Sequence, residues 1–237
     1  DNLLVGGIKS DQIFGLTLAE NGFFWLVEYD GIFGLGFDSL NNFNTTSTFS
    51  KMVKQKAVKN PYFSLHLNGE GDAGTLTLGD IDTTKFAGKL SYNKVSTLKG
   101  KYVYWMTNVD DISINGKKLK YKKRMAIFDT SSRVVFMSFG DADTYHKSIK
   151  GSRLVFDDAG GTYIVPCNTT DKVDYIFSGI NYPSTLIFSQ YENICYSSVQ
   201  YADFVDDSTW IIGGSFLRDV YSVYNIKDFT IGLAPAS

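Results

Sequence analysis

One acidic residue of this chain is placed where it could do chemistry. In the segment MAIFDTSSRVV, residues 125–135, a strand-like apolar run leads directly into Asp129. Three hydroxyl residues follow before apolar residues resume, namely Thr130, Ser131 and Ser132. An acid at such an elbow either starts a turn or is a titrating group held in a loop between two buried strands. The segment alone leaves both interpretations open.

Other chemistries have weaker support in the sequence. His66 and His146 are far from each other and from both cysteines, so we expect no metal site. No glycine cluster has the spacing of a phosphate-binding loop, and no serine is singled out for a Ser-His-Asp triad. We therefore expect neither a metal nor another cofactor.

The composition is that of an ordinary globular protein. The chain has 237 residues, of which 43% are hydrophobic and 20% charged, and its formal net charge is -2. This balance argues against a nucleic-acid partner. The basic run KKLKYKKR, residues 117–124, follows a hairpin signal, and we interpret it as a solvated hairpin arm rather than a nucleic-acid or membrane site. No apolar run reaches the roughly 20 residues that span a bilayer, so we expect no membrane span.

The local patterns predict a mostly β protein. Short runs rich in Val, Ile, Tyr and Phe are separated by polar turns, for example PYFSLHL, GTLTLGDI, KLSYNKV, YVYWMTNVDDISI, TYIVPC, STLIFSQY and WIIGGSF. The dipeptides Asn68-Gly69 and Asn115-Gly116 carry the chemistry of tight hairpin turns. Helical spacing predicts two short helices, at residues 46–58 and 141–149.

Several weak signals point to the secretory route. The chain has two cysteines, Cys167 and Cys195, and a bond between them would restrict the unfolded chain. Asn44 and Asn168 begin Asn-Thr-Thr sequons and are possible glycosylation sites. A cytosolic protein with chance sequons remains an alternative on these grounds. The chain starts at Asp1 within a plausible strand, so we expect it to be processed or to be a piece of a longer protein.

Four blocks occur in an order that resembles one known family. They are residues 6–37 (GGIKSDQIFGL through EYDGIFGLGF), 125–132 (MAIFDTSS), the loop between the cysteines, and 210–234 (WIIGGSF through TIGLA). Together they resemble the pepsin-like aspartic proteases. That family has similar Gln-x-Phe-Gly-Leu and Asp-Gly-Ile-x-Gly-Leu-Gly runs, a strand ending in Asp-Thr-Gly, and a Trp-Ile-Leu-Gly run that closes with Ile-Gly-Leu-Ala. The resemblance covers essentially the whole chain.

The resemblance implies a bilobal, mostly β acid-protease fold. Residues 1–90 would be the remainder of the N-terminal lobe with the inter-lobe strands, and residues 91–237 the complete C-terminal lobe. Such enzymes carry one catalytic aspartate in each lobe, and this sequence would begin after the first aspartate and the flap. An N-terminal segment or light chain would then supply the other aspartate. The resemblance also implies a zymogen, secreted or sent to a lysosome-like or vacuolar compartment.

The same resemblance assigns roles around Asp129. Asp129 would be the second-lobe member of a carboxylate pair that shares one proton, since two carboxylates about 3 Å apart cannot both ionise. The residues matching substrate-cleft or catalytic-loop positions are Tyr104, Ile127, Thr130, Ser131 and Ser132, with Cys167 and Cys195 matching a family disulfide. Ser132 would support the outer carboxylate oxygen, and Ile212 and Gly213 would lie behind the loop.

The predicted function is that of an aspartic endopeptidase, or part of one, acting on peptide or protein substrates with an activated water.

Two residues motivate an alternative function. Ser131 replaces the glycine of the family motif, and Arg133 places a cation near the proposed pair. A catalytically impaired homologue that acts as a binding or structural protein therefore stays open. A secreted β-rich carbohydrate-binding module is a third, weaker interpretation, because the ordered motifs have no reason to occur in it.

Overall fold

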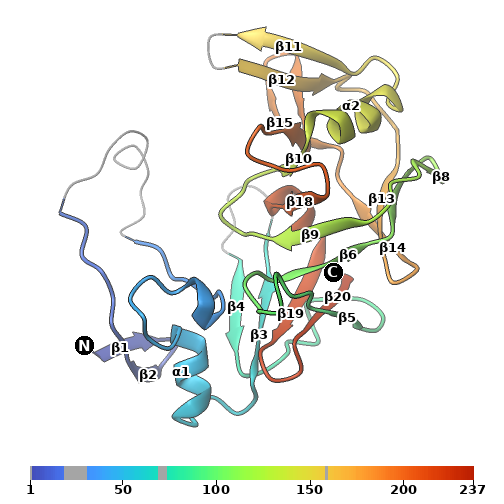
Figure 1. The fold of residues 1–237 in the computed structure, drawn as a ribbon. Helices are drawn as coiled ribbons and strands as arrows, with labels where there is room; N and C mark the ends of the chain where they lie inside the picture. The colour runs from blue at the N-terminus through green and yellow to red at the C-terminus, as the bar shows by residue number, and fades with distance from the viewer. Residues whose placement is uncertain (1, 19–30, 69–73, 158–159) are drawn as a thin grey trace.

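The computed structural model describes the chain except residues 1, 19–30, 69–73 and 158–159. It is mostly β, as predicted, with small sheets and short helices arranged along an elongated body (Figure 1). At the N-terminal end, β1 (Asn2–Val5) and β2 (Ile8–Asp11) form an antiparallel hairpin. The predicted turn at Asn68-Gly69 lies partly outside the described residues, as does part of the first motif block.

One five-stranded sheet joins distant parts of the chain. In sheet order its strands are β4 (Thr75–Leu78), β3 (Tyr62–His66), β19 (Val220–Asn225), β20 (Thr230–Pro235) and β5 (Ser91–Lys94). Figure 1 shows the red C-terminal strands beside the cyan β3. Because this sheet takes strands from both sides of residue 90, it bridges the two predicted segments. The division at residue 90 stays a prediction.

Aromatic side chains fill the core beside this sheet. The Phe63 and Tyr224 rings stack with centroids 4.9 Å apart, and Trp105 meets both edge-on at 5.7 and 5.1 Å. The buried Trp105 indole donates its N–H to the Leu35 carbonyl oxygen at 2.9 Å. This bond satisfies the one polar atom of an otherwise apolar side chain and ties the segment after residue 31 to the sheet.

A second five-stranded sheet carries the Asp129 loop. Its order is β17 (Val199–Tyr201), β10 (Val135–Met137), β18 (Thr209–Ile212), β9 (Arg124–Phe128) and β6 (Met106–Val109). The predicted strand WIIGGSF ends at Ile212, and the expectation of a strand beyond that point was wrong. Two glycines follow, and the chain instead turns into the short helix α3 (Gly214–Leu217).

Two four-stranded sheets complete the C-terminal half. One has the order β11 (Arg153–Asp157), β12 (Gly160–Val165), β16 (Ile194–Ser197) and β15 (Ile187–Tyr191). The other has the order β14 (Ile180–Ser184), β13 (Val173–Phe177), β7 (Asp111–Ile114) and β8 (Lys117–Lys118). Cys167 and Cys195 form the predicted disulfide and join the segment after β12 to β16.

The predicted hairpin at Asn115-Gly116 is present. Both residues have positive φ, 53° and 76°, as a tight turn of mirror-image type requires, and they connect β7 to β8. The basic run after the turn forms an arm with exposed lysines at positions 117, 118, 120, 122 and 123. This agrees with its interpretation as a solvated hairpin arm.

Both predicted helices form, with shifted ends. α1 (Thr48–Lys54) buries Phe49 and Met52, while α2 (Phe139–Lys147) begins two residues before its predicted start. α1 ends early because Lys56 adopts a positive φ of 57°. A 3-10 turn, η2 (Asp38–Leu40), precedes α1. None of the helices in the described part of the chain has the length and hydropathy of a membrane-spanning helix.

Candidate active site

Asp129 follows directly after β9, an interior strand of the second five-stranded sheet that lies between β18 and β6. Its backbone N–H donates to the Ile212 carbonyl oxygen at 3.0 Å, which continues the parallel pairing of β9 with β18. The preceding residue, Phe128, donates its N–H to the Trp105 carbonyl oxygen at 2.8 Å. The residue is therefore held from both sides by backbone hydrogen bonds, and its position is set by the sheet rather than by a free loop.

Three neutral donors surround the Asp129 carboxylate. Its Oδ1 accepts from the Ser131 backbone N–H at 2.9 Å and from the Ser131 hydroxyl at 2.6 Å. Its Oδ2 accepts from the Ser132 hydroxyl at 2.7 Å, as the resemblance implied for Ser132. A carboxylate has about four acceptor positions, so one position on Oδ2 remains for another group. Within the described residues no cation pairs with Asp129.

The loop after Asp129 packs against the backbone of a second segment. The Gly214 N–H donates to the Ser132 carbonyl oxygen at 2.7 Å, and the Ser215 N–H donates to the Arg133 carbonyl oxygen at 2.9 Å. A Cβ atom on Gly213 would lie 2.5 Å from the Ser132 carbonyl oxygen. Because no side chain fits there, Gly213 allows the two segments to approach closely, behind the loop as the resemblance implied.

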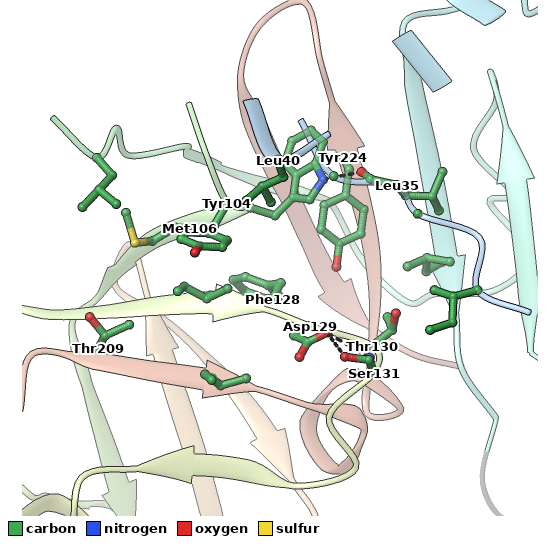
Figure 2. A pocket seen from close by; sticks show the side chains of 18 of the residues that line it. Leu35, Leu40, Tyr104, Met106, Phe128, Asp129, Thr130, Ser131, Thr209 and Tyr224 are labelled. Carbon is green, nitrogen blue, oxygen red and sulfur yellow. Dashed lines mark hydrogen bonds between the residues drawn. The ribbon is translucent and has the colours of Figure 1, made fainter. Parts of the chain in front are cut away.

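Asp129 lines a cavity of about 680 Å³. Four of the predicted cleft residues line the same cavity, namely Tyr104, Ile127, Thr130 and Ser131. Figure 2 shows Asp129 and Ser131 joined by hydrogen bonds at the end of β9, with Tyr104 and Met106 from the neighbouring chain segment. Ser132 is the exception, because its hydroxyl donates to the Asp129 carboxylate but the residue does not line the cavity. The structure thus brings the predicted site residues together.

Side chains from three neighbouring strands form the floor of the cavity, which the sequence analysis did not predict. Met106 of β6, Ile127 of β9 and Ile211 of β18 are direct register partners, so they form a row across three neighbouring strands. All three line the cavity, and so does Thr209, two residues before Ile211 on the same face of β18. Only the parallel pairing of β18 with β9 reveals this row, since the two strands are far apart in the sequence.

Ser131 does not force the loop into a conformation reserved for glycine. Its φ is not among the positive values found for nine other non-glycine residues. The Ser131 side chain is exposed, and its hydroxyl adds a hydrogen bond to Asp129 that a glycine would lack. The replacement therefore carries no left-handed backbone strain.

Arg133 turns away from the carboxylate. Its guanidinium carbon lies 5.0 Å from the centre of the Phe188 ring, a distance typical of a cation–π contact. The residue is exposed, so water screens its charge. Its cation is therefore directed at an aromatic face of β15 rather than at Asp129.

His146 has a structural role. His146 is buried in α2, where its Nδ1–H donates to the Ala142 carbonyl oxygen at 2.7 Å and its Nε2 accepts from the Ser197 hydroxyl at 2.8 Å. Burial lowers the pKa of His146 to about 4. Within the described residues no three His, Cys, Asp or Glu side chains gather as metal ligands would.

Both sequon asparagines, Asn44 and Asn168, are exposed.

Comparison with known proteins identifies the family. The model of the eukaryotic aspartyl protease family matches residues 1–236. The chain belongs to the eukaryotic aspartyl protease family. This agrees with the resemblance carried by the four motif blocks and with the mostly β fold.

Three curated relatives illustrate the relationship. The chain is 31% identical over 243 residues to the aspartic-type endopeptidase ctsD of Aspergillus fumigatus, covering 100% of the chain and 50% of that protein. It is 30% identical over 242 residues to a probable aspartic-type endopeptidase CTSD of Arthroderma otae, covering 99% of the chain and 62% of that protein. It is 30% identical over 248 residues to pepsin A of Bos taurus, covering 100% of the chain and 64% of that protein. The chain thus spans between half and two thirds of the length of these aspartyl proteases.

Proposed function

We propose that this chain is part of an aspartic endopeptidase and that Asp129 is one member of its catalytic carboxylate pair. The observation that carries the proposal is the Asp129 carboxylate, which lines a cavity and receives three neutral hydrogen bonds while one acceptor position stays available. The other carboxylate would come from a part of the protein outside this chain. The family membership supports this assignment.

The proposed chemistry needs one ionised and one protonated carboxyl group. The ionised carboxylate accepts a proton from a water, whose oxygen attacks the peptide carbonyl carbon, while the protonated partner donates its proton to the carbonyl oxygen. The resulting tetrahedral species breaks its C–N bond once the amide nitrogen has gained a proton. Neutral donors suit this role, because they hold the carboxylate in place without the permanent ion pair that a lysine or arginine would form.

Two observations support activity over the impaired alternative. Ser131 adopts a backbone conformation open to residues other than glycine, and Arg133 lies over Phe188. Neither departure from the family motif obstructs Asp129 in the way that the sequence suggested. Substrates would be peptides or unfolded proteins, since the cavity is lined largely by apolar side chains that an extended peptide can cover.

We also propose that the protein passes through the secretory pathway to an extracellular, lysosomal or vacuolar compartment. The Cys167–Cys195 disulfide and the exposed sequons at Asn44 and Asn168 support this route. Production as a zymogen with an N-terminal segment or light chain belongs to the same proposal.

The test uses the full-length protein that contains this chain, with an unfolded protein as substrate at acidic pH. We expect cleavage by the parent protein and no cleavage by Asp129→Ala. Asp143→Asn is the matched control, because Asp143 pairs with the exposed Lys147 on α2 and does not line the cavity. Unchanged turnover in Asp129→Ala would remove Asp129 from the mechanism, and a folded parent protein without activity would favour the impaired homologue.

A further inference from the structure

A second carboxylate, that of Asp206, lines the same cavity as Asp129. Asp206 lies on the exposed turn that leads into β18, three residues before Thr209, and both residues are part of the cavity wall. Sequence reasoning would class Asp206 as a turn former, since Asp-Asp-Ser is a common turn composition. Because Asp206 lies in the same cavity as the candidate catalytic group, its carboxylate can also contact a bound ligand.

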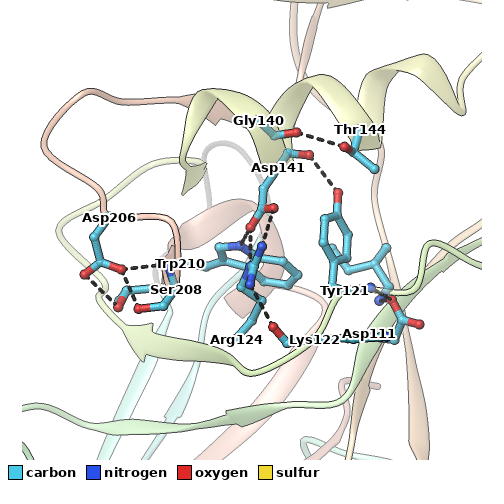
Figure 3. A network of polar contacts seen from close by, with 12 residues as sticks. Asp111, Tyr121, Lys122, Arg124, Gly140, Asp141, Thr144, Asp206, Ser208 and Trp210 are labelled. Carbon is cyan, nitrogen blue, oxygen red and sulfur yellow. Dashed lines mark hydrogen bonds and ion pairs between the residues drawn. The ribbon is translucent and has the colours of Figure 1, made fainter.

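The hydrogen bonds of Asp206 leave one oxygen largely available. Oδ1 accepts from the Ser208 N–H and the Ser208 hydroxyl, both at 2.7 Å, whereas Oδ2 accepts only from the Thr209 hydroxyl at 3.1 Å (Figure 3). The Ser208 hydroxyl and amide lower the pKa of Asp206, which keeps the group ionised in mildly acidic solution. The Ser208 bonds also fix the direction of the carboxylate, so the charge is held in place before any ligand binds.

Among the residues that the structure describes, no cation lies within ion-pair distance of this carboxylate. Asp203 and Asp207 are exposed on the same turn and add negative charge. The three ion pairs found among the described residues involve none of these acids. Arg124 interacts electrostatically with Asp207, but its ion pair is with Asp141. In the described part of the chain, the Asp206 carboxylate therefore has no ion-pair partner at its end of the cavity.

The floor between the two carboxylates is apolar. Ile127 and Ile211 are register partners on β9 and β18, and Phe136 of β10 continues the row beyond Ile211. The exposed Phe204 packs its ring 5.8 Å from that of Phe136 and lines the cavity two residues before Asp206. Thr209 pairs with Met125, four residues before Asp129, so the Thr209 end of the floor lies roughly 13 Å along the strands from the candidate catalytic carboxylate.

We propose that Asp206 is a specificity-determining residue that selects peptide substrates carrying a lysine or arginine side chain along this floor. The aliphatic stem of such a side chain would cover Ile127 and Ile211, and its cationic end would meet the available oxygen of Asp206. Lysine and arginine combine these two properties, because their stems pack on apolar surface while their charged ends stay at a polar boundary. The inference rests on the proposed function, since Asp129 marks where the scissile bond lies.

The test compares two matched peptides with the full-length protein. One series carries lysine, and the other carries norleucine, which keeps the stem and removes the charge. Each residue is moved through the three positions on either side of the scissile bond, since alternate residues of an extended peptide face the same side. At one position of that face, we expect kcat/KM to be about three- to tenfold higher with lysine, the range of a partly screened ion pair.

Asp206→Asn should reduce this ratio to about one while cleavage of the norleucine peptides stays close to that of the parent. Asn can keep acceptor bonds from Ser208, so the turn should remain intact. Asp203→Asn is the matched control, because Asp203 is exposed on the same turn but does not line the cavity, and it should keep most of the preference. Asp206→Lys should reverse the preference toward a glutamate peptide at a pH where glutamate is ionised.

Binding of uncleavable peptides separates this inference from the proposed function. The same lysine and norleucine peptides are made with a reduced scissile bond, and their dissociation constants are measured for the parent and for Asp206→Asn. If cleavage is absent but lysine still binds more tightly in an Asp206-dependent way, the proposed function fails and the specificity inference stands. Equal binding or equal cleavage of both peptides by the parent, or a preference that survives Asp206→Asn, would overturn the inference.

Discussion

Two aspartates of this chain, Asp129 and Asp141, each accept three hydrogen bonds from side-chain or backbone donors, but the donors are of different kinds. Asp141 lies buried in the first turn of α2. Its Oδ2 accepts from Arg124 Nε at 2.6 Å and from the buried Trp210 indole at 2.7 Å, and its Oδ1 accepts from Arg124 Nη2 at 2.9 Å (Figure 3). Asp129 lines a cavity and is bound only by neutral amide and hydroxyl donors.

The difference separates a structural acid from a candidate catalytic one. Arg124 contacts Asp141 through two guanidinium nitrogens, and the hydrogen bond to Asp141 raises the pKa of Arg124. These contacts hold α2 against β9 and β18, and they occupy the Asp141 carboxylate with structural partners. Neutral donors position Asp129 without a fixed counter-charge and leave one acceptor position of its carboxylate available.

The largest expected effect comes from breaking the buried pair. Asp141→Asn leaves the Arg124 cation without its counter-ion in a mostly buried position, so we expect a loss of roughly 3 kcal/mol in the free energy of unfolding. Chemical denaturation of the purified protein measures it. Asp143→Asn, which breaks the exposed pair with Lys147, should cost less than about 0.5 kcal/mol. Equal losses in the two variants would refute the structural role of the Asp141 network.

A second interior group predicts a pH dependence of stability. The pKa of His146 is lowered to about 4 by burial, below its ordinary value of 6.5. The unfolded chain therefore gains a proton on this histidine first as the pH falls, so stability is lost between pH 6.5 and 4, by about 3 kcal/mol at most. Denaturation series at several pH values should show this slope, and His146→Gln should flatten it. A slope that is unchanged in His146→Gln would exclude this histidine as its source.

The smallest effect is expected on the cavity side. Ser131→Gly and Ser131→Ala remove one exposed hydrogen bond to Asp129, and the backbone at this position needs no left-handed conformation. We therefore expect both variants to lose less than about 1 kcal/mol in the free energy of unfolding. Thermal unfolding of the two variants beside the parent provides the measurement. A loss as large as that of Asp141→Asn would mean that Ser131 holds the loop itself together.

The sequence predicted which residues gather at the site better than it predicted the shape of the site. The resemblance carried by the ordered motifs singled out Asp129, Tyr104 and Ile127 together, and these three residues line one cavity. The turn at Asn115-Gly116 was predictable because only a few residue types accept two consecutive positive φ values. These features depend on residues close together in the chain.

Features that depend on distant partners were not predictable. The direction of the Arg133 side chain is set by Phe188 on β15. The loop tolerates serine at position 131 because the backbone there does not have a positive φ, and no local sequence pattern reveals that value. The place of Asp206 on the cavity wall depends on the pairing of β18 with β9. Register between strands far apart in the sequence was the missing information in this last case.

The central claim, that Asp129 stabilises the transition state of peptide hydrolysis, is tested most directly by paired ligand binding to the full-length protein. One peptide carries a tetrahedral CH(OH) group in place of the scissile carbonyl, and the other carries CH2 at the same position. Transition-state mimics bind at least about a hundredfold more tightly than ground-state ligands. We predict such an advantage for the hydroxyl peptide in the parent protein and its collapse to less than about tenfold in Asp129→Asn. An advantage that persists in full in Asp129→Asn would contradict the account.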